Sequence, residues 1–350
     1  MHSSTSNSNH RIPRGPWGRT WLLATVLCAI TLVGYEMVWR GLGFTPSIHD
    51  DPDAWAVTRE RVRSDSVVLI GSSRIQADVD PGVWGEEWTV TPLQLAITGG
   101  SPVPVLEELA ADRTFAGTVI VDALPRIIFD IGRSRERLVL HWLAAYREAV
   151  QSPARMTESR LRVLFSGNLV SIRLPPWEFY VRSFVRSDPG RVPYVTMRAD
   201  RFMQLDFQLV DARERIDLIY GQILIQGEPA AGAEVTATIS RIDAAVRTIQ
   251  ARGGNVVLVH FPHDGKIRDL EEELYPRATY WDAMVSGIDA PAIHCEDEAT
   301  LARYSCPDGS HIDVRDAPAF TRILAGISYA RIADRRSLAD TDLPPPAGSR

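Results

Sequence analysis

The sequence has few cysteines, a single lysine and no nucleotide-binding signature. Its 38 basic and 44 acidic residues give a net charge of −6. This balance argues against nucleic acid as a partner, because proteins that bind it present a basic surface. The basic residues are almost all arginine, with Lys266 the only lysine, a bias that we attribute to genome composition. No GxxxxGK(S/T) or GxGxxG segment is present, so nothing in the sequence supports nucleotide binding.

Cysteine is scarce, with three residues in the chain. Cys28 lies in an apolar stretch, whereas Cys295 and Cys306 flank a short polar segment. In an oxidising compartment, a Cys295–Cys306 disulfide would close a loop of about 10 residues and add about 2–3 kcal/mol of stability. Two unrelated thiols are the alternative, and both remain open. No CxxC or HxxxH spacing accompanies these cysteines, so we expect neither a metal site nor a cofactor.

The N-terminal region has the pattern of a membrane anchor. Residues 1–16 are polar and carry Arg11 and Arg14, Arg19 follows closely, and an apolar stretch with aromatic residues at both ends comes next. We predict a transmembrane helix over 20–39 with residues 1–19 in the cytoplasm, because basic residues stay on the cytoplasmic side. A cleaved signal peptide and a buried core helix are the alternatives. No Ala-x-Ala site follows the apolar stretch, so we favour an uncleaved anchor.

The rest of the chain predicts one large globular domain of the α/β class. With 350 residues, 45% hydrophobic and 23% charged, the composition is that of a folded protein. A connector with an amphipathic helix is expected over 40–64 and a disordered tail over 336–350. Strands alternate with helices, a pattern typical of a parallel sheet. Strands are expected at 67–70, 89–97, 118–121, 255–260 and 290–294, and helices at 104–113, 234–252 and 316–327.

A helical insertion is expected over 131–235, between the third and fourth of these strands. It contains an aromatic- and proline-rich patch over 175–180. This patch has two interpretations, a lid or acceptor-binding surface and packing that covers the sheet. We favour packing, because aromatic residues lie more often in a core than on a ligand platform.

Two stretches far apart in the sequence suggest one chemistry. Gly71 interrupts the apolar run 67–70 and is followed by Ser72 and Ser73, so a serine is expected where a strand of an open α/β sheet ends, the usual place for a ligand site. Near the C-terminus, Asp308 and His311 are three residues apart. A nucleophilic serine needs an imidazole to take its proton and a carboxylate to orient the imidazole. Ser73, His311 and Asp308 are therefore the predicted catalytic triad.

These segments resemble the sequence blocks of the SGNH, or GDSL-like, hydrolase superfamily. Gly71-Ser72-Ser73 resembles the first block, Gly-Asp-Ser, with Ser72 in place of the aspartate. Leu95-Ala-Ile-Thr-Gly-Gly-Ser101 resembles the second, and Asp308-Gly-Ser-His311 matches the closing Asp-x-x-His. The resemblance covers roughly residues 65–125 and 250–330.

The resemblance also assigns residues around the serine. Gly99 matches the glycine whose N–H serves the oxyanion hole. The third block, Gly-x-Asn-Asp, is not matched, because Asp122-Ala-Leu-Pro-Arg126 stands in its place. Arg74, Arg126 or a backbone N–H is then the candidate replacement for the missing asparagine. In the superfamily the edge at which His260 and His263 lie also borders the active site, so the resemblance makes both histidines candidate substrate contacts; ordinary core or surface histidines are the alternative.

The resemblance implies a three-layer αβα, flavodoxin-like domain over 65–335 and a serine-dependent acyl transfer. The reaction would be O-acetyl ester hydrolysis or O-acetyl transfer on an extracytoplasmic glycan. The implied setting is a bacterial inner membrane with the domain in the periplasm. The implied partners are envelope polysaccharide or an acylated small molecule, and a multi-spanning membrane acyltransferase. The alternative is an inactive SGNH-fold scaffold that binds the polysaccharide or that membrane partner.

Overall fold

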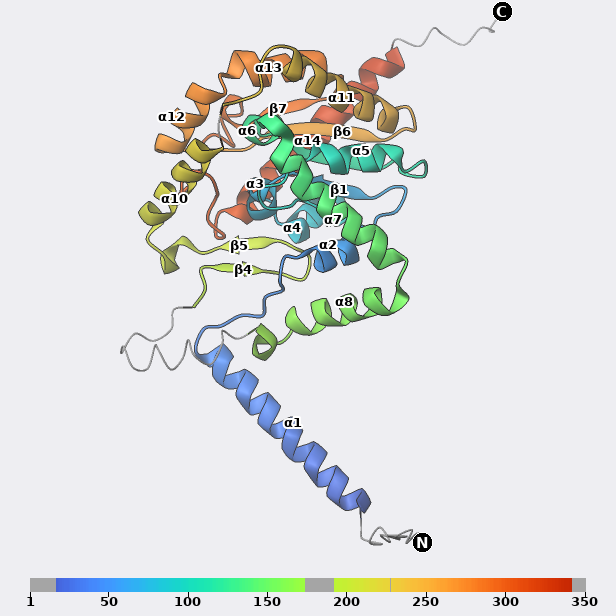
Figure 1. Cartoon of the computed structure of the whole chain (residues 1–350), viewed down its shortest axis with the longest axis vertical. Helices are drawn as coiled ribbons and strands as arrows, with labels where there is room; N and C mark the ends of the chain where they lie inside the picture. The colour runs from blue at the N-terminus through green and yellow to red at the C-terminus, as the bar shows by residue number, and fades with distance from the viewer. Residues whose placement is uncertain (1–16, 174–191, 227, 342–350) are drawn as a thin grey trace, which may run out of the picture.

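Five parallel strands form a central sheet in the computed structural model, which describes residues 17–173, 192–226 and 228–341 (Figure 1). Every pair of neighbouring strands in this sheet is parallel. The mixed α/β class expected from the sequence is therefore confirmed. In spatial order the strands are β2 (Leu93–Gln94), β1 (Val67–Ile70), β3 (Thr118–Asp122), β6 (Asn255–His260) and β7 (Ala292–His294).

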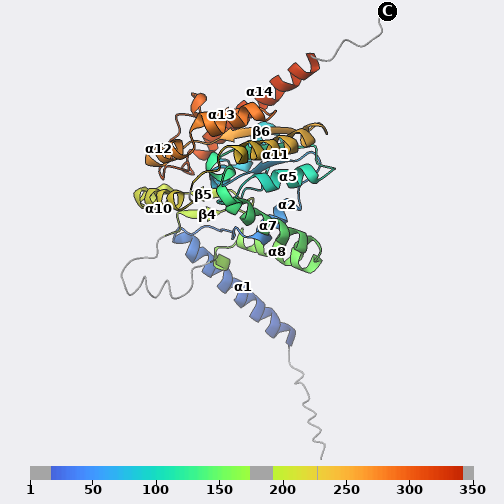
Figure 2. The same cartoon turned by 45° about the horizontal axis from the view of Figure 1, so that its top comes forward.

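Helices cover both faces of the sheet, which explains why its strands are continuous apolar runs rather than alternating ones. On β1, Val68 and Ile70 join one apolar core and Leu69 joins the other. The first core is covered by α5 (Val103–Ala111), α11 (Ala233–Gln250) and α13 (Arg277–Gly287). The second is covered by α3 (Ser73–Asp78), α4 (Pro81–Trp88) and α14 (Ala317–Thr341). Figure 2 shows α5 and α11 beside each other along the sheet.

The segment between β3 and α11 is largely helical, as the sequence predicts, but it also contains a two-stranded antiparallel hairpin. Because its strands, β4 (Val195–Met197) and β5 (Met203–Leu205), are only three residues long, no alternation marked them. The patch at 175–180 lies outside the described residues. The other elements are α6 (Pro125–Ile128), η1 (Ile131–Arg133), α7 (Ser134–Val150), α8 (Pro153–Ser166), η2 (Val170–Arg173), η3 (Phe207–Leu209) and α10 (Ala212–Ile225).

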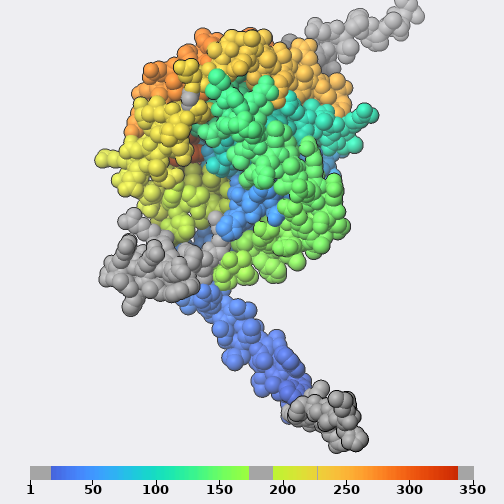
Figure 3. Space-filling model, viewed as in Figure 1, coloured from blue at the N-terminus to red at the C-terminus, as the bar shows by residue number. Residues whose placement is uncertain are grey.

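The N-terminal helix α1 (Trp17–Gly41) is long and apolar enough to span a membrane. It projects away from the domain and exposes nearly all of its apolar side chains (Figure 3). Its one buried residue, Glu36, accepts hydrogen bonds from the N–H groups of Val170 (2.8 Å) and Ser171 (3.0 Å). This carboxylate therefore fixes the end of α1 to the start of η2. The predicted connector then contains α2 (Pro52–Arg59), capped by Asp51.

Two element boundaries differ from the sequence prediction. The second strand was expected over 89–97, but β2 covers only Leu93–Gln94, because α4 ends at a left-handed Thr89 (φ 59°) shortly before it. The last helix was expected over 316–327 with a disordered tail from 336. Instead α14 continues through Thr341, and the last nine positions, 342–350, lie outside the described residues. The remaining helices near the sheet edge are α12 (Gly265–Leu274) and η4 (Cys295–Asp297).

Candidate active site

A sharp turn at the end of β1 presents Ser73 as the first residue of α3. The turn needs Gly71, whose φ is +149° and whose missing Cβ would lie 2.3 Å from the Cβ of Asp122. The Asp122 carboxylate accepts hydrogen bonds from the Ser72 N–H (3.0 Å) and the Ser72 hydroxyl (2.6 Å). Ser72, which stands where the aspartate of Gly-Asp-Ser would be, thus ties the turn to β3. The Ser73 side chain remains partly exposed.

The structure brings the three predicted triad residues into one hydrogen-bonded chain. His311 Nε2 lies 2.8 Å from Ser73 Oγ, and His311 Nδ1 lies 2.9 Å from Asp308 Oδ2. The second carboxylate oxygen, Asp308 Oδ1, accepts the N–H groups of Ser310 (2.9 Å) and His311 (2.8 Å). These two backbone contacts hold the Asp308 carboxylate beside the His311 ring, three residues further along the same loop. Residues 238 positions apart, Ser73 and His311, therefore meet at the carboxyl edge of the sheet.

Electrostatics keep the Asp308 carboxylate charged. Burial alone would raise its pKa, but the His311 ring and the N–H groups of Ser310 and His311 outweigh that cost and lower the pKa below its ordinary value. A charged Asp308 accepts the Nδ1–H of His311. The Nε2 lone pair of His311 then faces the Ser73 hydroxyl, which is the tautomer that a general base needs.

A second aspartate, Asp78, binds the backbone of the loop that carries Asp308 and His311. Asp78, at the end of α3, is fully buried, and its Oδ1 accepts the N–H of Ile312 at 2.9 Å. Burial raises the pKa of Asp78 well above its ordinary value. A neutral carboxyl at this position avoids a second negative charge beside Asp308. Burial likewise raises the pKa of Asp122, against the opposing effect of its hydrogen bonds from Ser72.

Arg74 does not occupy the substrate-facing position that was predicted for it. Its side chain is fully buried and donates two hydrogen bonds to Glu271, at 2.7 and 2.8 Å. Its Nε also donates a hydrogen bond to the hydroxyl of Ser310, at 3.2 Å. Ser310 lies between Asp308 and His311 in the loop that carries both triad residues. Because Arg74 is sealed from solvent, we correct its predicted role: it links the triad loop to α12. Glu271 is the residue that sequence reasoning missed here.

Arg126 shares the same carboxylate. Its Nε donates to Glu271 Oε1 at 2.6 Å. Burial would raise the pKa of Glu271, but Arg74 and Arg126 outweigh it and hold this pKa well below its ordinary value. One nitrogen of the Arg126 guanidinium is therefore bound to Glu271, although the side chain also lines a cavity described below.

Gly99 lies in the loop after β2, next to the nucleophile turn. Ile97 N–H donates to the carbonyl of Gly71 at 2.9 Å, and the Thr98 hydroxyl donates to Gln76 of α3 at 2.9 Å. Gly99 has φ +70°, a conformation that favours glycine. In the described part of the chain, the backbone N–H groups of Ser73 and Gly99 donate no hydrogen bond to protein. Both donors are thus free for a ligand.

The hairpin β4–β5 buttresses this loop, an anchoring that the sequence did not reveal. Arg201, left-handed at φ 66°, is fully buried and pairs with Asp50 at 2.6 Å. It also donates to the carbonyls of Gln94 (2.6 Å) and Ala96 (2.9 Å). A buried guanidinium with these partners fixes the backbone that leads to Gly99.

His260 faces a different space from the triad. A cavity of about 340 Å³ opens at the ends of β6 and β7, and in the described chain its lining includes no triad residue. His260 stacks on His294 with ring centroids 4.2 Å apart. Burial lowers the pKa of His260 well below its ordinary value and that of His294 to about 4. The lining of the cavity includes Arg126, His260, His263, Glu272, His294 and Glu296.

Of the two interpretations of Cys295 and Cys306, the structure supports unrelated thiols. Both are unpaired and buried in the core beneath α14. The Cys306 thiol points at the carbonyl of Pro262, 3.5 Å away. The disulfide is therefore corrected: each sulfur packs in an apolar environment, which also raises both thiol pKa values well above the ordinary one.

Comparison with known proteins does not assign the chain to a family. No protein-family model and no curated protein sequence matches the chain.

Proposed function

We propose that this protein is a membrane-anchored, SGNH-like serine esterase or O-acyltransferase. The observation that carries the proposal is the hydrogen-bonded chain Asp308–His311–Ser73, with distances of 2.9 and 2.8 Å. An aspartate, a histidine and a partly exposed serine in this order are the groups that acyl transfer requires. Ser73 comes from the first residue of α3, and Asp308 and His311 come from a loop near the C-terminus. Hydrogen bonds from Ser310, His311 and Arg74 hold that loop in place.

The strand order supports the SGNH part of the proposal. The order β2-β1-β3-β6-β7 has the same pattern as the flavodoxin-like order 2-1-3-4-5. In such sheets ligands bind beyond the carboxyl ends of the strands, where the order reverses. That point lies beside β1, whose end carries Ser73.

In the proposed reaction, Ser73 Oγ attacks the carbonyl carbon of an ester while His311 Nε2 takes its proton. His311 then returns that proton to the leaving alkoxide, and an acyl-Ser73 intermediate remains. Asp308 holds the Nδ1–H and stabilises the imidazolium in both steps. A water molecule or a sugar hydroxyl then attacks the acyl group while His311 takes its proton; the bond between the acyl carbon and Ser73 Oγ breaks, and His311 returns the proton to Ser73 Oγ. Water gives esterase activity and the sugar gives O-acyl transfer.

The proposed oxyanion donors are the N–H groups of Ser73 and Gly99. Two preorganised donors suffice for a tetrahedral oxyanion, and one donor is worth about 10²–10³ in kcat. The position of the missing asparagine block is held by Asp122, an acceptor already bound to Ser72. The two backbone donors therefore carry the stabilisation in this proposal.

The anchor suggests the setting. Arginines precede the apolar helix α1, and the positive-inside rule then leaves the domain outside the cytoplasm. An extracytoplasmic domain fixed to the membrane fits an envelope polysaccharide as acceptor and a multi-spanning membrane acyltransferase as acyl donor. This part of the proposal rests on analogy with the superfamily.

One observation favours a second candidate, an SGNH-fold scaffold without turnover. Arg74 and Arg126, the predicted substitutes for the missing asparagine, are both bound to Glu271. A site that lacks the asparagine donor of the superfamily would turn over more slowly, since one oxyanion donor is worth about 10²–10³ in kcat. Such a scaffold would bind envelope polysaccharide or the membrane partner with the triad intact.

The test is ester hydrolysis by the full chain in detergent. We expect acetate release from p-nitrophenyl acetate that falls to background in Ser73→Ala and in His311→Ala. Ser286→Ala and His141→Ala are matched controls, because both residues are exposed and lie on other helices; they should keep wild-type rates. Glycan acceptors added to the active protein then separate transferase from esterase.

Equal rates in wild type and Ser73→Ala would contradict the proposed chemistry. Polysaccharide binding that survives such a result would select the scaffold.

A further inference from the structure

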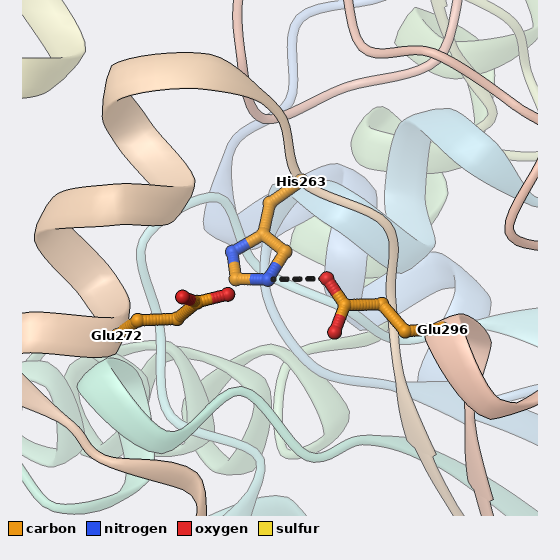
Figure 4. A group of neighbouring side chains, drawn as sticks. All are labelled: His263, Glu272 and Glu296. Atoms are coloured by element: carbon orange, nitrogen blue, oxygen red, sulfur yellow. Dashed lines mark ion pairs between the residues drawn. The ribbon is translucent and has the colours of Figure 1, made fainter.

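The cavity at the ends of β6 and β7 has a polar cluster that acyl transfer does not use. Three side chains, His263, Glu272 and Glu296, place one ligand atom each within 4.8 Å of one another. They come from the loop after β6, from α12 and from η4. Two consecutive segments and a third one further along the chain thus direct oxygen and nitrogen ligands to one point (Figure 4).

His263 is held in the orientation that a metal ligand requires. Its Nδ1 lies 2.8 Å from Glu271 Oε2, and Glu271 is itself fixed by Arg74 and Arg126. A carboxylate at Nδ1 directs the lone pair of Nε2 outward, which is the arrangement found behind most metal-bound histidines. The ring is almost fully buried, so it cannot turn away without breaking this contact.

The two glutamates meet the outward nitrogen. His263 Nε2 lies 3.5 Å from Glu296 Oε1, a separation slightly longer than a hydrogen bond. Two ligands that bind one ion at about 2.0–2.1 Å lie about this far apart in tetrahedral geometry. Figure 4 shows the carboxylates of Glu272 and Glu296 approaching the ring edge from opposite sides. Both side chains reach solvent, which gives an ion a route of entry.

Two further histidines line the same cavity. His260 and His294 are more than nine-tenths buried, both line the cavity, and each has an Nδ1 with no hydrogen bond among the described residues. Buried polar atoms are normally satisfied. Both Nδ1 atoms are sealed from solvent, so the candidate metal ligands remain His263, Glu272 and Glu296.

We propose that His263, Glu272 and Glu296 bind one divalent transition-metal ion, with water completing its coordination. One imidazole and two carboxylates with an open position form a donor set suited to Zn²⁺. The sequence did not predict it, because the ligands are not spaced as a known motif. The inference does not depend on the proposed acyl transfer, since no triad residue lines this cavity in the described chain.

The test measures Zn²⁺ binding to the full chain, purified in detergent without a histidine tag and stripped with EDTA. Titration against a chromophoric chelator should give one Zn²⁺ per chain. Glu272→Gln and Glu296→Gln should each weaken the affinity by at least about tenfold, the scale seen when a metal site loses a supporting group. Both residues are exposed, so the fold should survive. Glu273→Gln, the exposed neighbour on α12, is the matched control and should bind as wild type.

Cobalt substitution gives a second readout. Co²⁺ in the site should show visible bands without the thiolate charge-transfer band, because no cysteine is among the proposed ligands. Wild-type protein that binds no Zn²⁺, or binding that neither glutamine variant weakens, would overturn the proposal. Either result would leave His263 as a metal-free ion-pair partner of Glu271 and Glu296.

Discussion

Replacing Asp308 with asparagine separates its catalytic role from its structural one. Oδ1 accepts two backbone N–H groups, and Oδ2 accepts His311 Nδ1. An asparagine oxygen keeps the two backbone contacts, whereas its NH₂ group would face Nδ1. The histidine would then take the opposite tautomer, with its proton on Nε2 and no lone pair for Ser73 Oγ. The loop should remain folded while the base is lost.

The expected effect is a loss of about 10⁴ in kcat, as for the equivalent change in serine proteases, which corresponds to about 5 kcal/mol of transition-state stabilisation. Asp308→Ala should lose the activity and also the two backbone contacts, at about 1–3 kcal/mol of stability. Asp316→Asn, exposed in the same segment, is the control and should match wild type in both respects.

The assay is p-nitrophenyl acetate hydrolysis beside a thermal melt of each variant. The charge of Asp308 also gives a pH dependence. Because its pKa is lowered on folding, the carboxylate contributes stability above its unfolded pKa of about 3.9, and this is lost as the pH falls through the folded value. Asp308→Asn should lose that acid dependence. A variant with wild-type kcat, or one inactive only because it is unfolded, would refute the reasoning.

Three other substitutions change contacts at the turn after β1, beneath the triad loop and at the end of α1. Gly71→Ala should cost about 3 kcal/mol or more, because its φ of +149° and the 2.3 Å approach of Asp122 leave no room for a Cβ; a melt that shifts by less than about 2 °C would contradict this. Asp78→Asn should stabilise the protein above pH 5. The raised pKa of Asp78 makes wild-type stability fall as pH rises from the unfolded towards the folded value, by about 1.4 kcal/mol per unit. Melts across pH 4–8 test it, and a difference that stays constant with pH would count against it. Glu36→Ala should leave the N–H groups of Val170 and Ser171 without their acceptor and speed their hydrogen exchange, while unchanged protection would disprove the junction.

The parts of the fold that the sequence predicted are those that local pattern determines. The strands at 67–70 and 255–260 contain continuous apolar runs rich in β-branched residues, and such runs need burial on both faces whatever their neighbours. The helix α11 was visible because its apolar residues recur at helical spacing and two glycines follow it. The short β4–β5 hairpin was missed, because three-residue strands carry too little pattern to detect.

The candidate site divides in the same way. Ser73, Asp308 and His311 stand in short segments whose residue types and order are informative. Glu271 is different, because it lies in the run Asp269-Leu-Glu-Glu-Glu273, where nothing local separates it from its neighbours. Its role arises when the fold buries it between Arg74 and Arg126. Arg74 was misassigned for the related reason that sequence adjacency to Ser73 does not reveal which way a side chain points.

The most direct test of the central claim is the site of covalent labelling by a fluorophosphonate probe. The full chain in detergent is incubated with the probe, and the adduct is located by peptide mass spectrometry. We predict a single adduct on Ser73 that disappears in His311→Ala, because an unassisted serine hydroxyl does not react at a useful rate. An unlabelled wild type with a normal melt, or an adduct on another serine, would contradict the account.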